Sequence, residues 1–391
     1  MDQRTIQQFF ALLRSAICGK KLTDEERSDY TPTALSELTK LASKHDIAHL
    51  LALAAKQNGL TAKNTGDSEK YILKAVYRYE QLNHTYTRLC EALEEAQIPF
   101  LPLKGAVLRG YYPEAWMRTS CNIDILVHGE DVDRAVDILV DKHGYASKGY
   151  TYNEKGVHDV SLFSPNKAHL ELHFDLIEDG LANEASKVLR EVWNSAVIRE
   201  GFAFWYEMPD EMFYFYHIAH MAKHLENGGC GVRPFIDLWL LDNLKNANCM
   251  KRKELLEQGG LLKFAEIVRK LSKIWFECAQ HDPITQQLES YLLYGGIYGS
   301  YKNRVFVQQQ IKGGRLRYVL SKVFLPYSII KEHYPVLEKH RWLTPFMEVR
   351  RWCKLIFCGH IKRVAADISF DGNISNKEES NIRQFVKNIG L

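Results

Sequence analysis

Carboxylate, amide and imidazole side chains recur with the same parity in two short apolar runs of the sequence. Asn122 and Asp124 lie two residues apart in NIDILV, and Glu171 and His173 lie two residues apart in HLELHF. Residues two apart on a β-strand project from the same face, so each pair is expected to point the same way. If the two strands are neighbours, Asp124 and Glu171 converge, and carboxylate oxygens are the ligands that Mg²⁺ prefers.

A lysine–glycine turn precedes these two runs. Lys104 and Gly105 follow the apolar FLPL and are expected to open a helix, whose first N–H groups favour a phosphate. Gly105 permits close approach of the backbone, and Lys104 adds a positive charge. Arg118 is a further candidate contact for a phosphate or for the metal site, with pairing to Glu114 or to a carbonyl as the alternative. Metal ions and cationic side chains together neutralise the charge that develops in phosphoryl and nucleotidyl transfer.

The elements that must position these residues fall into three regions. Apolar residues at helical spacing predict a helical N-terminal region over residues 1–98, and helical spacing returns in a C-terminal region over 208–391. Between them, over 99–207, the pattern becomes that of alternating short strands and helices. The predicted fold class is therefore α+β, with a small mixed-sheet core flanked by helical regions at both ends.

The segments that lead to and build this core can be delimited from capping and turn residues. The predicted elements are a long helix over 65–97 that starts near Asp67 or Ser68, a short strand and helix around the Lys104 turn, a buried strand at 122–127, a helix at 131–142 that ends near Gly144, and strands at 159–163 and 168–176 joined by a hairpin turn.

Composition limits the classes of partner. The 391 residues are 46% hydrophobic and 25% charged, which is typical of a globular chain with a sizeable core. The formal charge of +3, from 51 basic and 48 acidic residues, gives no strong field for long nucleic acids or anionic lipids. A locally basic stretch at 302–363 is interpreted as a solvated helical face. Eight scattered cysteines without a Cys-x-x-Cys pair, and no signal or membrane-spanning segment, predict a soluble cytoplasmic protein without a membrane partner.

The segment from FLPLKG to GYA, residues 100–146, closely resembles the uncharacterised nucleotidyltransferase family of the polymerase-beta superfamily. Members of that family carry Leu-Lys-Gly, Tyr-Tyr-Pro, an Arg, Asp-Ile-Asp-x-Leu-Val, a helix and Gly-Tyr in this order. LELHFDL resembles the family's Glu-Leu-His strand, and the likeness extends more loosely over most of the chain. The resemblance implies a two-metal nucleotidyltransferase core, with Lys104 and Gly105 on the nucleotide-binding turn, Asp124 as the second metal carboxylate and Glu171 as the third.

Asn122 departs from the family pattern, which has the first Asp of its Asp-x-Asp pair at this position. An amide oxygen can contact a cation but brings no negative charge, so metal affinity should fall. Three interpretations stay open. The site is weakened or inactive, Asp159 or Asp175 compensates, or an Asp→Asn change was introduced to hold substrate without turnover.

The expected activity is transfer of a nucleoside monophosphate from a nucleoside triphosphate, with ATP as the default, to an acceptor. Asp124, Glu171 and Asn122 are the predicted catalytic and metal residues for Mg²⁺, with Mn²⁺ as the alternative ion. Lys104, Gly105 and Arg118 are predicted to bind the nucleotide. The acceptor stays open among a small molecule, a protein and an RNA end, as does the oligomeric state. The alternative is a catalytically inactive nucleotide-binding module that recruits a partner, and position 122 separates the two hypotheses.

Several other polar residues have structural interpretations. His173 is interpreted as a satisfied sheet histidine, with orientation of a site residue as the alternative. His217, His220 and His224 share one helix face and are interpreted as packing residues rather than as a metal cluster. Arg233 and Asp237, four residues apart, are predicted to pair on one helix, although Lys223 or Arg233 could reach a triphosphate.

Overall fold

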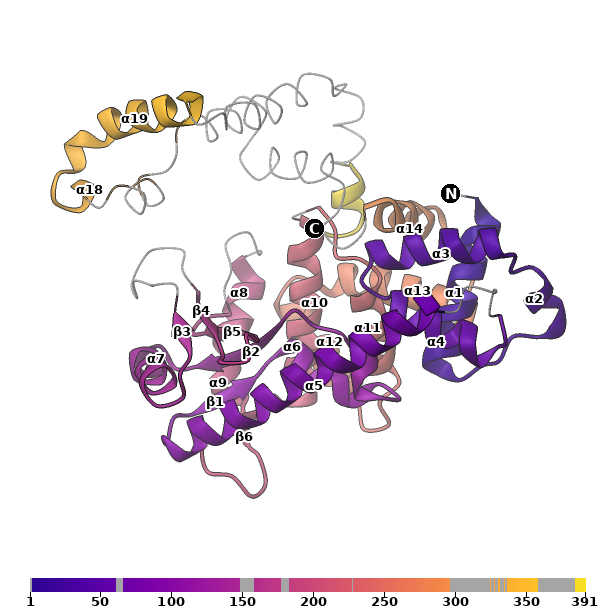
Figure 1. Cartoon of the computed structure of the whole chain (residues 1–391), viewed down its shortest axis with the longest axis horizontal. Helices are drawn as coiled ribbons and strands as arrows, with labels where there is room; N and C mark the ends of the chain where they lie inside the picture. Colours follow the sequence, from indigo (N-terminus) through magenta and orange to yellow (C-terminus); the bar gives the residue numbers. More distant parts are fainter. Residues whose placement is uncertain are drawn as a thin grey trace.

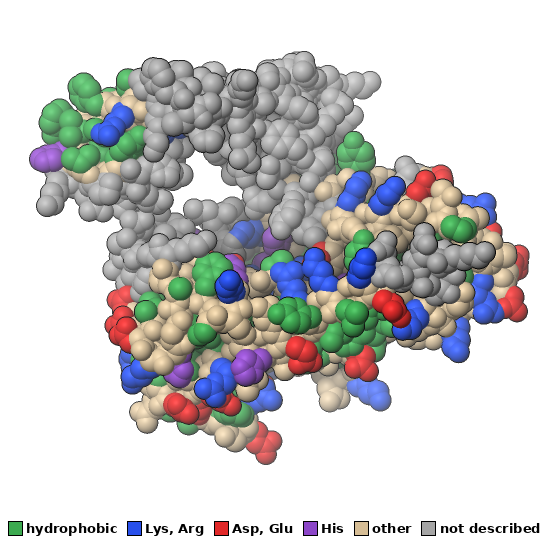
Figure 2. Space-filling view, in the orientation of Figure 1, with side chains coloured by type: hydrophobic (Ala, Val, Ile, Leu, Met, Phe, Trp, Pro, Cys, Tyr) green, Lys and Arg blue, Asp and Glu red, His purple; other side chains and the backbone are tan. Residues whose placement is uncertain are grey.

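The structure is a computed structural model that describes residues 2–60, 66–147, 158–176, 183–226, 228–295 and 384–391, together with parts of 324–357 (Figure 1). Most of the basic stretch at 302–363 lies outside the described residues. The face shown in Figure 2 carries both basic and acidic side chains, and several Lys and Arg side chains gather near its middle. No helix among the described residues is long and apolar enough to span a membrane.

In the described part of the chain, five helices precede the sheet. Their first residues follow side-chain caps where the sequence offers one, as at Asp2, Thr23 and Thr31, each of which accepts a bond from a backbone N–H of the helix it opens. The helices are α1 (Gln3–Cys18), α2 (Asp24–Ser28), α3 (Pro32–Lys44), α4 (Ala48–Gln57) and α5 (Gly66–Glu95). The long α5 runs from the other N-terminal helices to the sheet (Figure 1), so it connects the two ends of the molecule.

The sheet has five strands in the order β1-β2-β5-β4-β3. The strands are β1 (Phe100–Pro102), β2 (Asn122–Val127), β3 (Ala146–Ser147), β4 (Asp159–Phe163) and β5 (His169–His173). Only the central β2–β5 pair is parallel, and the pairs β1–β2, β4–β5 and β3–β4 are antiparallel. The predicted α+β fold with a small mixed sheet is therefore confirmed.

The two faces of the sheet have different partners because side chains alternate along each strand. Ile123, Ile125 and Val127 of β2 lie in an apolar cluster with the C-terminal half of α5 and with α7 (Val132–Asp141). The intervening Leu126 belongs instead to a second cluster, which contains the N-terminal and C-terminal helices. Asn122 and Asp124 have the parity of Leu126, so they lie on the face that turns toward the C-terminal helices.

The remaining described elements are mostly helical. Short turns of helix connect the strands, namely α6 (Lys104–Leu108), η1 (Arg109–Tyr111), η2 (Ala115–Met117) and η3 (Gly129–Asp131). After the sheet come α8 (Asn183–Arg190), α9 (Val192–Ser195), the β6–β7 hairpin (Val197–Ile198 and Tyr206–Glu207), α10 (Asp210–Glu226), α11 (Arg233–Asp242), α12 (Cys249–Gln258), α13 (Leu262–Glu277), α14 (Pro283–Gly295), α18 (Val336–Lys339), η4 (Arg341–Leu343) and α19 (Thr344–Phe357).

The N-terminal and C-terminal helices share one apolar cluster. Phe10 of α1 stacks on Trp275 of α13, with ring centroids 4.4 Å apart and an angle of 18° between the rings. Leu101 of β1 and Leu103, which directly follows β1, belong to the same cluster. The division of the chain at residues 98 and 207 stays a prediction, because this packing crosses both positions.

Candidate metal and nucleotide site

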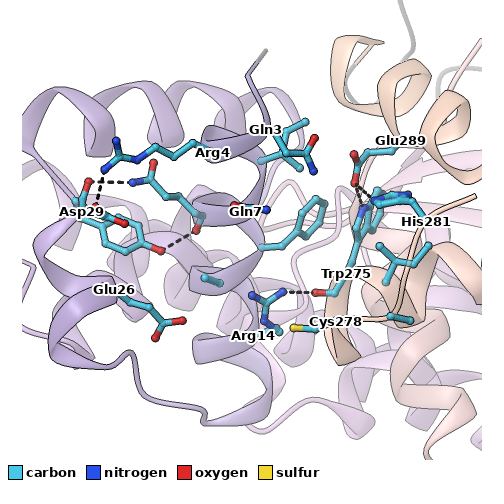
Figure 3. Close-up of a pocket in the computed structure, with 17 residues that line it drawn as sticks. Gln3, Arg4, Gln7, Arg14, Glu26, Asp29, Trp275, Cys278, His281 and Glu289 are labelled. Carbon is cyan, nitrogen blue, oxygen red and sulfur yellow. Dashed lines mark hydrogen bonds and ion pairs between the residues drawn. The ribbon is translucent and has the colours of Figure 1, made fainter.

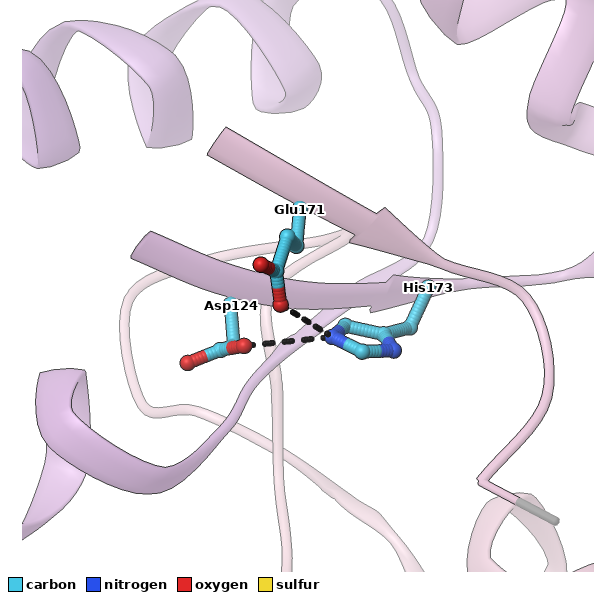
Figure 4. Close-up of side chains that lie close together, drawn as sticks. All are labelled: Asp124, Glu171 and His173. Atoms are coloured by element: carbon cyan, nitrogen blue, oxygen red, sulfur yellow. Dashed lines mark hydrogen bonds and ion pairs between the residues drawn. The ribbon is translucent and has the colours of Figure 1, made fainter. Parts of the chain in front are cut away.

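Two acidic side chains converge from the two central strands. Asp124 of β2 is the register partner of Glu171 of β5, as the same-parity argument requires for neighbouring strands. His173 lies two residues further along β5, and its Nε2 is 3.1 Å from Oδ1 of Asp124 and 3.7 Å from Oε2 of Glu171 (Figure 4). One ligand atom from each of these three residues lies within 4.8 Å of the others. Among the described residues, this is the group of acidic, histidine or cysteine side chains that could hold a metal ion.

The group is largely withdrawn from solvent. Asp124 is 4% exposed and His173 is 5% exposed, whereas Glu171 is half-buried. Burial alone would raise the pKa of Asp124, but the charge of Lys104 and the hydrogen bond with His173 hold that pKa below its usual range. Burial opposes the charged form of His173, yet its bonds with Asp124 and Glu171 raise its pKa. Asp124 is thus kept as an anion, which is the form that binds a cation.

Asn122 contacts this group as a hydrogen-bond donor. Its Nδ2 lies 3.1 Å from Oδ1 of Asp124. Asp159 is the register partner of His173 across the β4–β5 pair, and Asp175 lies 3.8 Å from His158, but neither belongs to the three-residue group. The role of Asn122 as a metal ligand stays a prediction.

Lys104 stands at the first position of α6 with an unusual backbone. Its φ is +38°, in the left-handed region that residues with a side chain rarely adopt. Its Nζ lies 3.4 Å from Oδ1 of Asp124. Burial lowers the pKa of Lys104, but electrostatic interactions, of which those with Tyr216 and Asp124 are the largest, raise that pKa by more than burial lowers it. The net shift is upward, so the ammonium keeps its charge. Backbone strain next to a buried ion pair is typical of a functional site.

Gly105 is packed tightly against the segment that leads into β2. A Cβ atom at this position would lie 3.1 Å from Nη1 of Arg118 and 3.2 Å from Cβ of Ser120. Glycine is therefore required here by close packing, in addition to any role in approach to a phosphate. Helix α6 has only five residues, so its dipole contributes little to the site.

Arg118 is engaged by a carboxylate from a distant part of the sequence. Its Nε and Nη2 donate to Oδ1 and Oδ2 of Asp237 at 3.1 and 2.8 Å, and its Nη1 donates to the Thr119 carbonyl oxygen. The Tyr112 hydroxyl donates to the same Asp237 carboxylate at 2.7 Å. A direct contact of Arg118 with phosphate stays a prediction, and in the structure its guanidinium fixes the segment beside Gly105.

A family model described as uncharacterised nucleotidyltransferase matches residues 31–277, which is more than half of the chain. The chain belongs to this nucleotidyltransferase family. No curated protein and no solved structure matches the chain.

The part of the chain that matches the nucleotidyltransferase family contains the whole three-residue group and its surroundings. It includes Lys104, Gly105, Arg118 and Asp237, and it ends at the last residue of α13. Helices α1, α2 and α14 lie outside the match.

Two residues of this site have partners that the sequence pattern does not identify. His173 is bonded, as expected of a satisfied sheet histidine, but its Nε2 lies between the two carboxylates, which fits the alternative that it orients a site residue. Its shared parity with Glu171 was the available signal. The predicted Arg233–Asp237 pair was wrong. Arg233 donates through Nη1 to Asp46 and to the Thr119 carbonyl oxygen, both at 3.0 Å. The carboxylate of Asp237 accepts from Arg118 instead.

The histidines of α10 lie beside the Lys104 turn. Nε2 of His217 is 3.0 Å from the Pro234 carbonyl oxygen, and the Nε2 atoms of His220 and His224 are 3.1 Å apart. Aromatic neighbours surround them, with Tyr216 6.2 Å from His220 between ring centroids. The contact of His217 with Pro234 joins α10 to α11 at the edge of the site.

A hollow of about 430 Å³ lies between α1, α2, α13 and α14, away from the three-residue group (Figure 3). It shares no residue with the three-residue group. Several polar groups that line it are paired with one another: Arg14 donates to the Trp275 carbonyl oxygen, and the Trp275 Nε1 donates to Glu289.

Proposed function

We propose that the protein is a metal-dependent nucleotidyltransferase that moves a nucleoside monophosphate from a nucleoside triphosphate to an acceptor. The observation that carries this proposal is the convergence of Asp124, Glu171 and His173 from two adjacent strands beside Lys104. Membership of the nucleotidyltransferase family supports it.

Asp124 and Glu171 would hold the cation, with Nε2 of His173 as a third donor. Oxygen ligands favour Mg²⁺ or Mn²⁺, and an imidazole donor is more common for transition metals, so this set favours Mn²⁺ more than an all-carboxylate set would. When bound, the cation would supply neutralisation of phosphate charge. Asn122 adds no charge, and we assign it the role of orienting Asp124 through its Nδ2 donor.

Lys104 would bind phosphate oxygens of the triphosphate, with ATP as the first candidate. In the reaction, an acceptor hydroxyl oxygen forms a bond to the α-phosphorus and its proton passes to solvent. The bond from that phosphorus to the oxygen that bridges it to the β-phosphate breaks, and pyrophosphate leaves with that oxygen. Arg118 would act through Asp237 by holding the segment against which Gly105 packs. The sheet face that carries the carboxylates turns toward the C-terminal helices, so the acceptor would approach from that side.

The second candidate is a catalytically inactive nucleotide-binding module that recruits a partner. Asn122 is the specific observation that favours it, because the position lacks the carboxylate of the family pattern and the amide is already bonded to Asp124. The two candidates share nucleotide binding and differ in turnover.

The test measures nucleotide binding and pyrophosphate release in parallel, for each of the four nucleoside triphosphates. Calorimetry of the chain with ATP should show affinity at least tenfold higher with Mg²⁺ or Mn²⁺ than in chelator. Asp124→Asn should abolish that metal dependence and lower pyrophosphate release by about 10²–10³-fold, the usual effect of losing one charge-stabilising group. Asp137→Asn, which changes an exposed carboxylate of α7 outside the three-residue group, is the matched control.

Metal-dependent binding without release from any triphosphate, with the chain itself, water and candidate hydroxyl compounds as acceptors, would establish the inactive module. Equal ATP affinity in chelator and in Mg²⁺ or Mn²⁺ would contradict both candidates.

A further inference from the structure

Lys104 also lines a small cavity between α6, α10 and α11. Its volume is about 90 Å³, and its charged and imidazole lining comes from Lys104, Arg118, Arg233, His217, His220 and His224 together with Asp237. We call it the basic cavity. A single water needs only ~15 Å³ of such space, so there is room for a small polyatomic anion but not for a nucleoside.

The charges around the basic cavity are predominantly positive. Asp237 is the carboxylate among the residues that line it, and Asp237 already accepts two bonds from Arg118 and one from Tyr112. Arg233 uses Nη1 for Asp46 and for the Thr119 carbonyl, but its Nε is buried without a hydrogen-bond partner. A buried donor without a partner is unfavourable, and an anion that accepts from it would remove that cost.

The pair formed by His220 and His224 adds one donor to the cavity without adding charge. Burial and the charge of Lys104 lower the pKa of His224 to about 4 and place the pKa of His220 well below its ordinary value. Both imidazoles are therefore neutral near pH 7, and each has one N–H. Their Nε2 atoms are 3.1 Å apart, so one of these atoms donates to the other, and the N–H at Nδ1 of the accepting imidazole is the one that remains.

We propose that the basic cavity binds a phosphate-type oxyanion, with Arg233 and the remaining N–H of the His220–His224 pair as donors and Lys104 shared with the metal site. Lys104 makes this connection because its Nζ lies 3.4 Å from Asp124. The inference rests on the proposed function for the origin of the anion. That origin is either the terminal phosphates of the nucleoside triphosphate or a phosphate group carried by the acceptor.

The probe is sodium pyrophosphate, added to the full chain in chelator so that no cation takes part. The unfolding temperature should rise by roughly 5 °C at a hundredfold excess over the dissociation constant, compared with sodium chloride at equal ionic strength. Arg233→Gln should weaken pyrophosphate binding at least tenfold, measured against the variant's own baseline. The double variant His220→Asn/His224→Asn provides a second reading that leaves the Arg233–Asp46 ion pair in place.

Arg269→Gln is the matched control. Arg269 also pairs with an aspartate at 3.0 Å, Asp242, but it does not line the basic cavity, so this variant should keep the full pyrophosphate effect. No increase beyond that of chloride, or an equal increase in wild type, Arg233→Gln and the histidine double variant, would overturn the proposal.

Competition separates the two origins of the anion. If the basic cavity takes the terminal phosphates of the triphosphate, ATP should displace pyrophosphate and Arg233→Gln should weaken ATP but not AMP. If it takes a phosphate of the acceptor, inorganic phosphate should add its stabilisation to that of saturating ATP. Arg233-dependent pyrophosphate binding without any metal-dependent transfer would retain the cavity and remove the nucleotidyltransferase proposal, so the two can fail separately.

Discussion

At the scale of single residues, three donors of the proposed metal site converge on one oxygen atom. Lys104 Nζ, Asn122 Nδ2 and His173 Nε2 all approach Oδ1 of Asp124, at 3.4, 3.1 and 3.1 Å. Charged and neutral donors on one carboxylate oxygen keep the group anionic despite its burial, because each favours the ionised form. Oδ2 accepts none of these three bonds, which leaves it available to a cation.

Asn122→Asp is expected to make the fold depend on that cation. The variant exchanges the Nδ2 donor for a second carboxylate next to Asp124, so in chelator like charges repel and a hydrogen bond is lost. The free energy of unfolding should fall by about 1–3 kcal/mol in chelator and recover in Mg²⁺. Pyrophosphate release should increase, because a stronger cation site stabilises charge that grows in the transition state. Thermal unfolding with chelator and with Mg²⁺, paired with a release assay, measures both effects.

Asn122→Ala serves as the control for this change, since it removes the same donor without adding charge. Its loss of stability should be the same with and without Mg²⁺. A variant Asn122→Asp that behaves like Asn122→Ala in both solutions would show that no cation binds next to position 122.

At the scale of elements, the α6 turn is held by packing more than by its own hydrogen bonds. The short helix presses Gly105 against Arg118 and Ser120, and Arg118 is in turn fixed by Asp237 of α11. The side chain of Arg118 is 9% exposed and that of Asp237 is 1% exposed, so removal of either partner would leave a buried charge. The turn that carries Lys104 is therefore positioned by a helix that follows it by more than a hundred residues.

Gly105→Ala is expected to disturb this arrangement. The added methyl group would lie 3.1 Å from a guanidinium nitrogen that is already committed to other bonds, so the protein should lose about 1–3 kcal/mol of stability and bind ATP more weakly. Gly110→Ala is the matched control, because nothing lies within 4 Å of a Cβ at Gly110, in the very next turn. Chemical denaturation and ATP calorimetry on the two variants test the expectation. Equal stability and equal ATP affinity in both variants would argue against a packing role for Gly105.

Local pattern predicted the strands well and the long-range partners poorly. The strands expected at 122–127 and 159–163 coincide with β2 and β4, since period-two alternation and turn residues are local signals. Parity also predicted that Asp124 and Glu171 would meet if their strands were neighbours. The pairing of Arg118 with Asp237 was beyond such reasoning, because 119 residues separate them and only tertiary packing brings them together.

At the scale of the whole molecule, the site lies where two apolar clusters meet at the sheet. One face of β2 packs on α5 and α7, and the other carries the carboxylates toward a cluster that runs through the N-terminal and C-terminal helices. Four leucines of the region 99–207 belong to this helical cluster, namely Leu101, Leu103, Leu108 and Leu126. The helices therefore supply the second wall of the site as well as a covering for the sheet.

A fragment of residues 99–207 is accordingly expected not to fold alone, even though it holds the three-residue group. It would expose Leu101, Leu103, Leu108 and Leu126, each at most 2% exposed in the full chain, and would lose α5 from the opposite face of the sheet. Each exposed leucine side chain forfeits about 1.5–3 kcal/mol, and four of them approach the whole stability of a typical domain. Circular dichroism during heating should show no cooperative transition for the fragment.

In the full chain, Phe10→Ala is a milder test of whether the core and the helices unfold together. Phe10 packs on Trp275 far from the carboxylates, and its truncation should cost about 3–5 kcal/mol. If the clusters unfold as one unit, this variant should lower the temperature of the same transition that ATP and Mg²⁺ raise, because ligands that bind only the folded site stabilise whatever unfolds with it. The opposite outcome is two separate transitions, one that responds to ATP and Mg²⁺ and one that Phe10→Ala lowers. That result would show that the core folds independently of the helices, and it would support the boundaries at residues 98 and 207.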